Sequence, residues 1–196
     1  MKILFHTTFI ITILFGVASC KNTSKPNDVN SFASLSMGNN NISSEAIIAE
    51  EKEKDSKFLF DVARVSLEDI KLGKLVQKYS TSAEVKELGE MMEDAHTQIL
   101  NEIRALAKSK MIDMPTSLSE RAQEDYISLS SKSGKDFNVE YCDMMVIGYK
   151  DTIAKFEKNY AESKDTDIKQ WIIDTLPELR KHLNHSVACQ RKSEKM

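Results

Sequence analysis

The sequence predicts an all-α protein built on a four-helix bundle, and three observations lead to this fold class. First, the segment from Ser82 to Lys110 repeats apolar residues at three- and four-residue steps, which draws one apolar stripe on a helix. Second, three other segments of similar length repeat this spacing. Third, the 196 residues include only 6 Gly and 3 Pro, so little interrupts long helices. A helix of roughly 40 Å, at about 1.5 Å per residue, needs partners of similar length.

The expected helices can be placed in order along the chain. Thr81 and Glu84 have the spacing of a capping box at the start of the second helix, and Pro115 marks its end. Asp165 or Thr166 caps the fourth long helix. A short extra helix lies in the crossover between the second and third long helices. The predicted ranges are 55–79, 82–110, 117–132 for the short helix, 137–161 and 168–191.

The N-terminal segment predicts export. Lys2 precedes an apolar run over residues 3–15 that is too short to span a bilayer comfortably and ends in small residues. The motif Val17-Ala18-Ser19-Cys20 is similar to the bacterial lipobox, in which the Cys thiol is acylated and the peptide bond before it is cut. The alternative is an ordinary secretory signal with Cys20 as a bystander.

Lipidation of Cys20 would anchor the chain to a membrane, and the anchor site separates the signal peptide from the mature chain. The segment that follows is rich in Asn and Ser without helical or strand periodicity, so we expect a flexible tether. The location expected is the bacterial cell envelope, at the periplasmic or surface side of the outer membrane. The predicted divisions are 1–19 for a lipoprotein signal peptide, 20–54 for the tether and 55–191 for the helical bundle.

Composition excludes some partners and gives no sign of catalysis. The net charge is −3, and Lys alternates with Glu without a basic tract, which argues against nucleic-acid binding. The chain lacks a Gly-rich phosphate loop, a nucleophile elbow and a Cys-x-x-Cys motif. We therefore assign no catalytic residue. The expected partners are the membrane, through the lipid on Cys20, and an envelope protein of unknown identity.

Several sequence strings resemble one bacterial family. EDIKLGKLV, HTQILNEIRALAKSK followed by MPTSL, FNVEYCDMMV, FEKNY and DTLPELRKHL occur in an order and spacing similar to the domain of unknown function 4142 (DUF4142). The resemblance covers roughly Phe58 to Ala188. It implies a ferritin-like four-helix bundle in an exported or envelope protein, with no established activity.

A ferritin-like bundle suggests a metal site in its core. Such bundles hold metal ions with inward Glu residues and Glu-x-x-His motifs, because ligands three residues apart share one helix face. Glu93 and His96 have this spacing on the second long helix. Asp69, on the apolar face of the first helix, and Glu178 with His182 on the fourth would complete a site for iron or another transition metal.

Two departures from the family pattern favour a structural interpretation without a cofactor. Where the family carries an Asp-His pair on the third long helix this chain has Gly148 and Tyr149, and Ala95 replaces the Asp before His96. Buried polar groups must find partners within the protein. The preferred prediction is therefore a hydrogen-bonded network inside the bundle formed by Asp69, His96, Tyr149 and His182.

Two cysteines remain besides Cys20. Cys142 lies 22 residues before Lys164, in the last interhelical turn, and Cys189 lies 25 residues after it. On antiparallel helices this places them nearly level, with an offset of about 5 Å. They could form a disulfide in an oxidising compartment or remain two buried free thiols.

Three functions follow from these features. The first is a structural, binding or stress-related module without catalysis of its own. The second is a metal-binding or metal-redox protein that uses the core polar residues. The third is an assembly module, which would expose an apolar patch on the short helix at 117–132.

Overall fold

The computed structural model describes residues 44–195, and within that range it has five helices and no strands. The predicted signal peptide, Cys20 and most of the predicted tether lie outside the described residues. The protein is therefore all-helical over the part that can be described. The helices are α1 (Ser44–Tyr79), α2 (Ala83–Ser109), α3 (Glu120–Ser130), α4 (Gly134–Glu162) and α5 (Thr166–Ser193).

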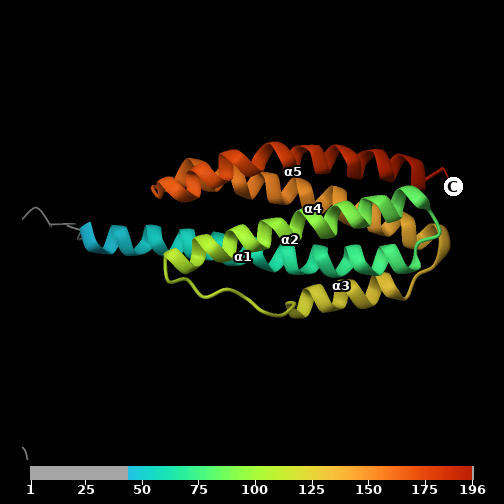
Figure 1. Ribbon diagram of the computed structural model, residues 1–196, viewed down its shortest axis with the longest axis horizontal. Helices are drawn as coiled ribbons and strands as arrows, with labels where there is room; N and C mark the ends of the chain where they lie inside the picture. The colour runs from blue at the N-terminus through green and yellow to red at the C-terminus, as the bar shows by residue number, and fades with distance from the viewer. Residues whose placement is uncertain (1–43, 196) are drawn as a thin grey trace, which may run out of the picture. The chain divides into compact units, whose positions relative to one another are not determined.

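Helix α1 begins earlier than the predicted first helix. Residues 44–54, assigned to the tether from the sequence, continue α1 and extend past the ends of its neighbours (Figure 1). This segment contains neither Gly nor Pro, and Glu50 and Lys54 form an i,i+4 ion pair of 2.8 Å. Its side chains are almost all exposed, including Ile47 and Ile48. A charged sequence with good helix formers thus prolongs the helix without burying a face.

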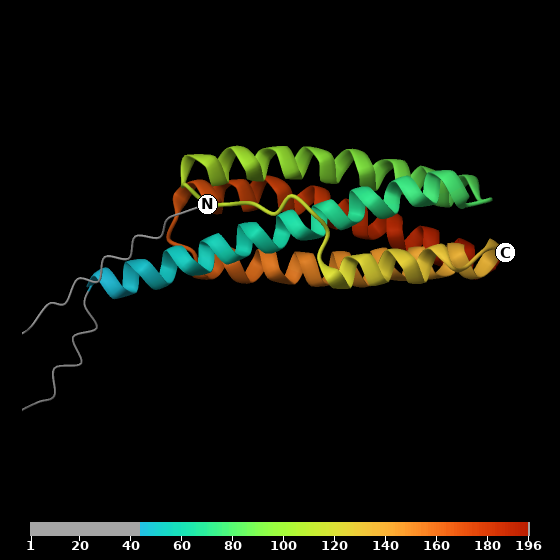
Figure 2. The same cartoon turned by 90° about the horizontal axis from the view of Figure 1, so that it is seen from below.

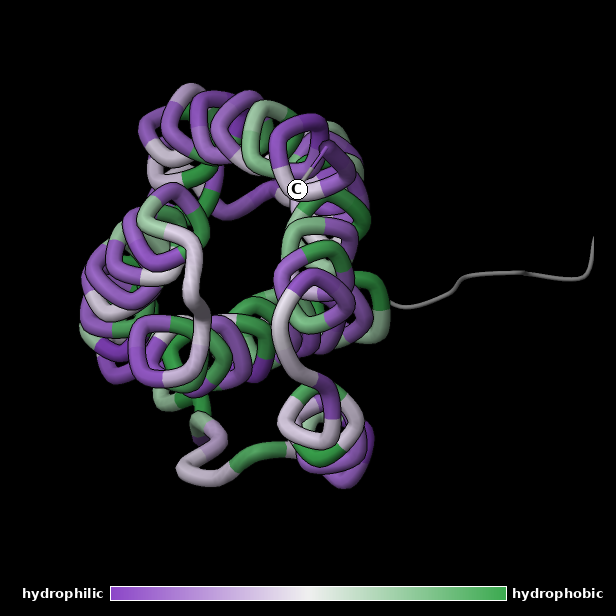
Figure 3. The backbone as a smooth tube through the Cα atoms, turned by 90° about the vertical axis from the view of Figure 1, so that its right-hand side faces the viewer, coloured by the Kyte–Doolittle hydropathy of each residue, from purple (hydrophilic) through white to green (hydrophobic). Residues whose placement is uncertain are grey.

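The long helices pair as two antiparallel hairpins. Helix α1 packs against α2, and α4 packs against α5. The connection after α2 does not return locally; it runs back along the bundle, carrying α3, so that α2 and α4 point the same way (Figures 1 and 2). Viewed along the bundle, the four long helices surround a common centre and α3 lies outside them (Figure 3). Helix α3 contacts α1 and α4.

Most of the predicted apolar stripes face the core. On α4 every residue of the stripe is buried: Cys142, Met145, Tyr149, Thr152 and Phe156. On α1 the apolar positions are Phe58, Val62, Val65, Leu72 and Val76, of which Val65 is partly exposed. Across all helices the largest fully buried side chains include Tyr141, Phe137, Phe156, Leu59, Leu72, Met92, Ile103, Leu129, Ile168, Ile172, Leu179 and His96.

Helices α1 and α2 approach each other closely at two glycines. A Cβ atom built on Gly73 would lie 2.5 Å from the carbonyl oxygen of Gly89, and one built on Gly89 would lie 3.0 Å from the carbonyl oxygen of Gly73. No ordinary side chain fits at so short a distance from backbone. The two glycines therefore set the spacing of the hairpin that carries Asp69 and His96.

The N-terminal cap of α5 is the residue predicted from the sequence, and that of α2 differs by one residue. Asp165 caps α5, because its carboxylate accepts hydrogen bonds from the N–H groups of Asp167 and Ile168. Helix α2 is capped by Ser82, one residue after the predicted Thr81; the Ser82 hydroxyl accepts from the N–H of Val85. Within residues 44–195, no helix is long and apolar enough to cross a membrane.

Candidate functional site

A polar cluster lies in the centre of the bundle, where α1, α2 and α4 meet. His96 of α2, only 2% exposed, is its hub: Nε2 lies 3.0 Å from Oδ2 of Asp69 and 2.7 Å from the hydroxyl of Tyr149. The Tyr149 hydroxyl donates to Sδ of Met92 at 2.8 Å, and Nδ1 of His96 lies 3.3 Å from Oγ of Ser66. The predicted network is thus present for Asp69, His96 and Tyr149. We call Ser66, Asp69, Met92, His96 and Tyr149 the core polar cluster.

Both ring nitrogens of His96 are engaged inside the cluster. Ser66 donates its hydroxyl hydrogen to the carbonyl of Val62, and its oxygen lies 3.3 Å from Nδ1 of His96. Nε2 lies within hydrogen-bonding distance of both the Tyr149 hydroxyl and the Asp69 carboxylate. Neighbours from α1 and α4 thus satisfy the buried imidazole of α2.

His182 of α5 lies beside the cluster without joining the hydrogen bonds. Its ring meets that of Tyr149 edge-on, with 5.6 Å between centroids, and its Nδ1 is buried with no hydrogen-bond partner among the described residues. Burial, reinforced by the charge of His96, lowers the pKa of His182 from 6.5 to about 4. His182 is therefore neutral near pH 7.

The tyrosines of the core stay in the phenol form. Burial raises the pKa of Tyr141 and of Tyr149 well above 10, and the negative charge of Asp69 adds to this effect. The hydroxyl of Tyr141 is fully buried and has no hydrogen-bond partner among residues 44–195. Within the part of the chain that the structure describes, two buried side-chain atoms thus have no hydrogen-bond partner, the hydroxyl oxygen of Tyr141 and Nδ1 of His182.

The structure does not bring the other predicted metal ligands to this cluster. Glu93 accepts a 2.7 Å hydrogen bond from Gln77 and lies 3.4 Å from Nζ of Lys74 at the edge of the α1–α2 interface. Glu178 is exposed and pairs with Lys181 at 3.2 Å. Over the described part of the chain, no group of three or more His, Cys, Asp or Glu side chains is arranged to hold a metal ion. Of the five predicted ligands, only Asp69 and His96 are in contact.

A cavity of about 380 Å³ opens toward Asp69 from the surface between α1, α3 and α4. Glu68 and Asp69 of α1 contribute carboxyl groups, and Gly148 of α4 contributes a wall without a side chain. A Cβ built on Gly148 would meet no atom within 4 Å. We call this the α1–α3–α4 cavity. Through Asp69 it connects the surface with the core polar cluster.

Glu68 is the group with the strongest electrostatic perturbation in this cavity. Burial raises its pKa from 4.5 to about 7, and the charges of Asp69 and Asp125 add to the effect against those of Arg121 and Arg64. Its carboxyl group is therefore part protonated near neutral pH. Perturbed carboxyl groups in clefts mark candidate functional sites.

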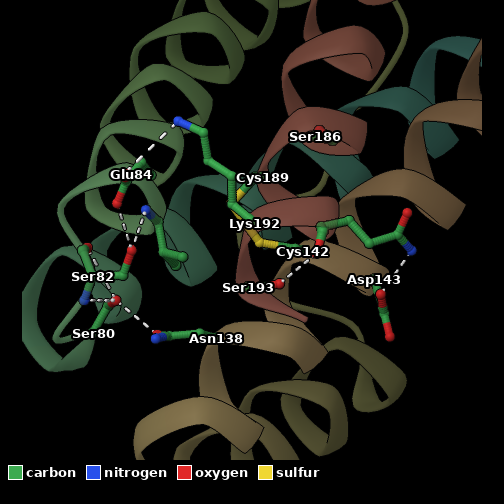
Figure 4. Close-up of a disulfide and its surroundings, with 12 residues drawn as sticks. Ser80, Ser82, Glu84, Asn138, Cys142, Asp143, Ser186, Cys189, Lys192 and Ser193 are labelled. Carbon is green, nitrogen blue, oxygen red and sulfur yellow. Dashed lines mark hydrogen bonds and ion pairs between the residues drawn. A yellow bond between two sulfur atoms is a disulfide. The ribbon is translucent and has the colours of Figure 1, made fainter. Parts of the chain in front are cut away.

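Cys142 of α4 and Cys189 of α5 are joined by a disulfide, with their Cα atoms 6.0 Å apart (Figure 4). The near-level positions expected from the sequence place both thiols at this point. Close to it, Gln190 donates a 2.8 Å hydrogen bond to Asp143, so α4 and α5 are linked twice at the same level.

Sequence reasoning missed several residues of the site. Ser66 lies three residues before Asp69 and Met92 four residues before His96, so helical spacing places each on the same face as its neighbour in the cluster. That signal was available. Glu68 and Arg64 gave no comparable signal, because both have the spacing of an ordinary solvent-exposed pair.

The short helix shows little of an assembly surface. Among the large apolar side chains of α3, only Ile127 is strongly exposed, at 65%, while Leu129 is buried against the bundle. A single exposed side chain is common on soluble domains. The predicted apolar patch on this helix is therefore not present within α3.

These features define an all-helical bundle domain with a buried polar core and a charged cavity beside it. The chain belongs to the family described as Domain of unknown function (DUF4142), whose family model matches residues 42–188. The family suggested by the sequence strings is thereby confirmed, over a slightly longer range. No curated protein matches the chain. No solved structure matches it either.

Proposed function

We propose that this protein is a lipid-anchored component of the bacterial cell envelope, whose ferritin-like four-helix bundle is a structural, binding or stress-related module without catalysis of its own. The lipobox-like motif ending at Cys20 supports the anchor. The family match supports the domain assignment. The single long crossover between α2 and α4 supports a ferritin-like topology, which has one such connection.

One observation carries the non-catalytic role: the polar side chains of the core are bound to each other. Asp69 and Tyr149 both contact Nε2 of His96, and Ser66 contacts its other nitrogen. A nucleophile or general base must be able to reach a substrate, whereas His96 is 2% exposed and has both nitrogens engaged. The cluster instead fixes the positions of α1, α2 and α4.

Two measurements test this proposal. Cells grown with labelled palmitate should incorporate label into the wild-type protein and not into Cys20→Ala, and the wild type should sediment with membranes. A wild type that takes up no label, or Cys20→Ala that stays with the membrane to the same extent, contradicts the anchor. The second measurement is the thermal stability of the purified protein before and after chelation, which the proposal expects to be equal.

A second candidate function is binding of one transition-metal ion through His96 and His182, and the unpaired Nδ1 of His182 favours it. A buried polar atom without a partner costs about 1–3 kcal/mol, which a bound ion would recover. The carboxylate-rich set with Glu93 and Glu178 does not fit, because both side chains are engaged elsewhere. Stoichiometric metal in the purified protein, lost in His182→Leu and retained in His185→Leu, would establish this candidate. Metal below one tenth of an equivalent would reject it.

A further inference from the structure

Two oppositely charged, half-buried side chains of α1, Arg64 and Glu68, line the α1–α3–α4 cavity one helical turn apart. Neither makes a hydrogen bond or ion pair with another described residue. The other inner carboxylate, Asp69, is already paired with His96, and Asp125 lies 3.6 Å from Arg121. A partly buried charge is costly unless an opposite charge meets it. Asp151 and Lys155 also line the cavity but are exposed to solvent. Among the described residues, Arg64 and Glu68 are therefore the half-buried charges of the lining that a ligand can pair with.

Part of the remaining wall is apolar, although charged and polar side chains also line the cavity, and it has room for a side chain. Leu72 of α1 and Met145 of α4 are almost fully buried and line the inner part of the cavity. Gly148, one turn from Met145, leaves open the space that any other residue would fill. The volume of about 380 Å³ lies at the lower end of the range of small-molecule sites, about 300–1,000 Å³.

We propose that this cavity binds a small zwitterion with an apolar side chain, of the size of a free amino acid or a dipeptide. Its carboxylate pairs with Arg64, its ammonium group pairs with Glu68, and its side chain lies on Leu72 and Met145 beside Gly148. Residues four apart on a helix have Cβ atoms about 5–6 Å apart, so one molecule that carries its ammonium group and its carboxylate on the same carbon atom reaches both side chains. A simple cation or a simple anion would leave one of the two charges unpaired.

This inference names the ligand class for the binding role in the proposed function and rests on that role, but it does not depend on the lipid anchor. Loss of palmitate labelling would contradict the anchor and leave the cavity unaffected. Failure of ligand binding would contradict the cavity assignment and leave the anchor unaffected. The two failures are therefore distinguishable.

The test compares three probes on the full-length protein in detergent by saturation-transfer NMR titration. The probes are L-leucine, isopentylamine, which lacks the carboxylate, and 4-methylpentanoate, which lacks the amine. A charge-assisted hydrogen bond contributes about 1.5–3 kcal/mol, so L-leucine should bind at least about tenfold more tightly than either half-molecule. Equal affinity for isopentylamine would show a simple cation site, equal affinity for 4-methylpentanoate a simple anion site, and both overturn the proposal.

Three variants locate the binding. Glu68→Gln and Arg64→Gln each remove one charge contact, and each should weaken L-leucine binding about tenfold or more. Gly148→Leu fills the cavity without touching either charge and replaces a helical glycine by a better helix former, so the protein should fold at least as well and lose binding. Glu90→Gln, on an exposed part of α2, is the matched control and should bind like the wild type. No saturable binding up to about 10 mM L-leucine, or unchanged binding in Gly148→Leu, overturns the assignment.

Discussion

The closest contact between α1 and α2 makes a quantitative prediction about Gly73. In Gly73→Ala the new methyl group would lie 2.5 Å from the carbonyl oxygen of Gly89 and 3.2 Å from the backbone nitrogen of Glu93. Both neighbours are backbone atoms, which cannot rotate away, so the two helices must separate. Alanine favours a helix over glycine by about 1 kcal/mol, but overpacking a core costs about 1–3 kcal/mol, and this contact belongs at the upper end.

The net effect expected for Gly73→Ala is a loss of about 2 kcal/mol in the free energy of unfolding. For a domain of this size, 1 kcal/mol shifts the melting temperature by about 2–4 °C, so we expect a decrease of about 4–8 °C. The measurement is circular dichroism at 222 nm during thermal and urea denaturation. The urea midpoint should fall without a change in slope, because the fold itself is retained.

Gly148→Ala is the matched control, because it makes the same chemical change in a helix where the new methyl group meets nothing within 4 Å. It should gain the helix propensity alone, about 1 kcal/mol, and melt about 2–4 °C higher than the wild type. Opposite signs for the two variants isolate the cost of the close contact. If Gly73→Ala is as stable as the wild type, the helices are not held at this spacing and the reasoning fails.

Three further predictions concern the core, pH and the disulfide. Asp69→Asn removes the partly buried carboxylate that contacts Nε2 of His96 and should lower the free energy of unfolding by about 1–3 kcal/mol. Glu93→Gln, whose partners are Gln77 and the exposed Lys74, should change it by less than about 1 kcal/mol. Urea denaturation measures both. The pKa of Glu68 is raised from 4.5 to about 7, so the folded state binds more protons than the unfolded state in this window and the contribution of Glu68 falls as pH rises; the pKa of His182 is lowered from 6.5 to about 4, so its contribution falls as pH falls. Because the two effects oppose each other, the free energy of unfolding of the wild type should depend little on pH between about 5 and 6.5. After allowance for solvent screening, this free energy should fall by about 1–2 kcal/mol toward acid in Glu68→Gln and by a similar amount toward neutral pH in His182→Leu. Parallel curves of unfolding free energy against pH for all three proteins would contradict these shifts. Reduction of the Cys142–Cys189 disulfide, across a separation of 47 residues, should lower stability by up to about 4 kcal/mol, and dithiothreitol should have no effect on Cys142→Ser.

The helices themselves could be predicted from the sequence, because a stripe of apolar residues at 3.6-residue spacing is a local property. The stripe of α4 from Cys142 to Phe156 is buried as predicted, and Asp165 caps α5. Asp69 was expected to point inward because it interrupts an apolar face, and it contacts His96. A polar residue on an apolar stripe must find a partner across the bundle, so the sequence already indicated a polar core.

The partners across the bundle could not be predicted in the same way, because they depend on rotation and offset between helices. Glu93 and His96 have the spacing of a metal-binding pair, yet only His96 faces the centre, since the close approach at Gly73 and Gly89 turns Glu93 toward Gln77. Glu178 is exposed although His182, four residues later, is buried. Spacing along one helix gives a shared face but does not say whether both residues reach the core.

The sequence by itself determined the helices, their apolar faces and the family. Only the tertiary structure decided the direction of the crossover, which could have returned locally and instead runs the length of the bundle to make α2 and α4 parallel. It also decided that α3, together with α1 and α4, encloses a cavity lined by Glu68 and Gly148. Periodicity is fixed within a helix by backbone geometry, whereas the path of a polar loop and the space beneath it depend on how already formed helices pack.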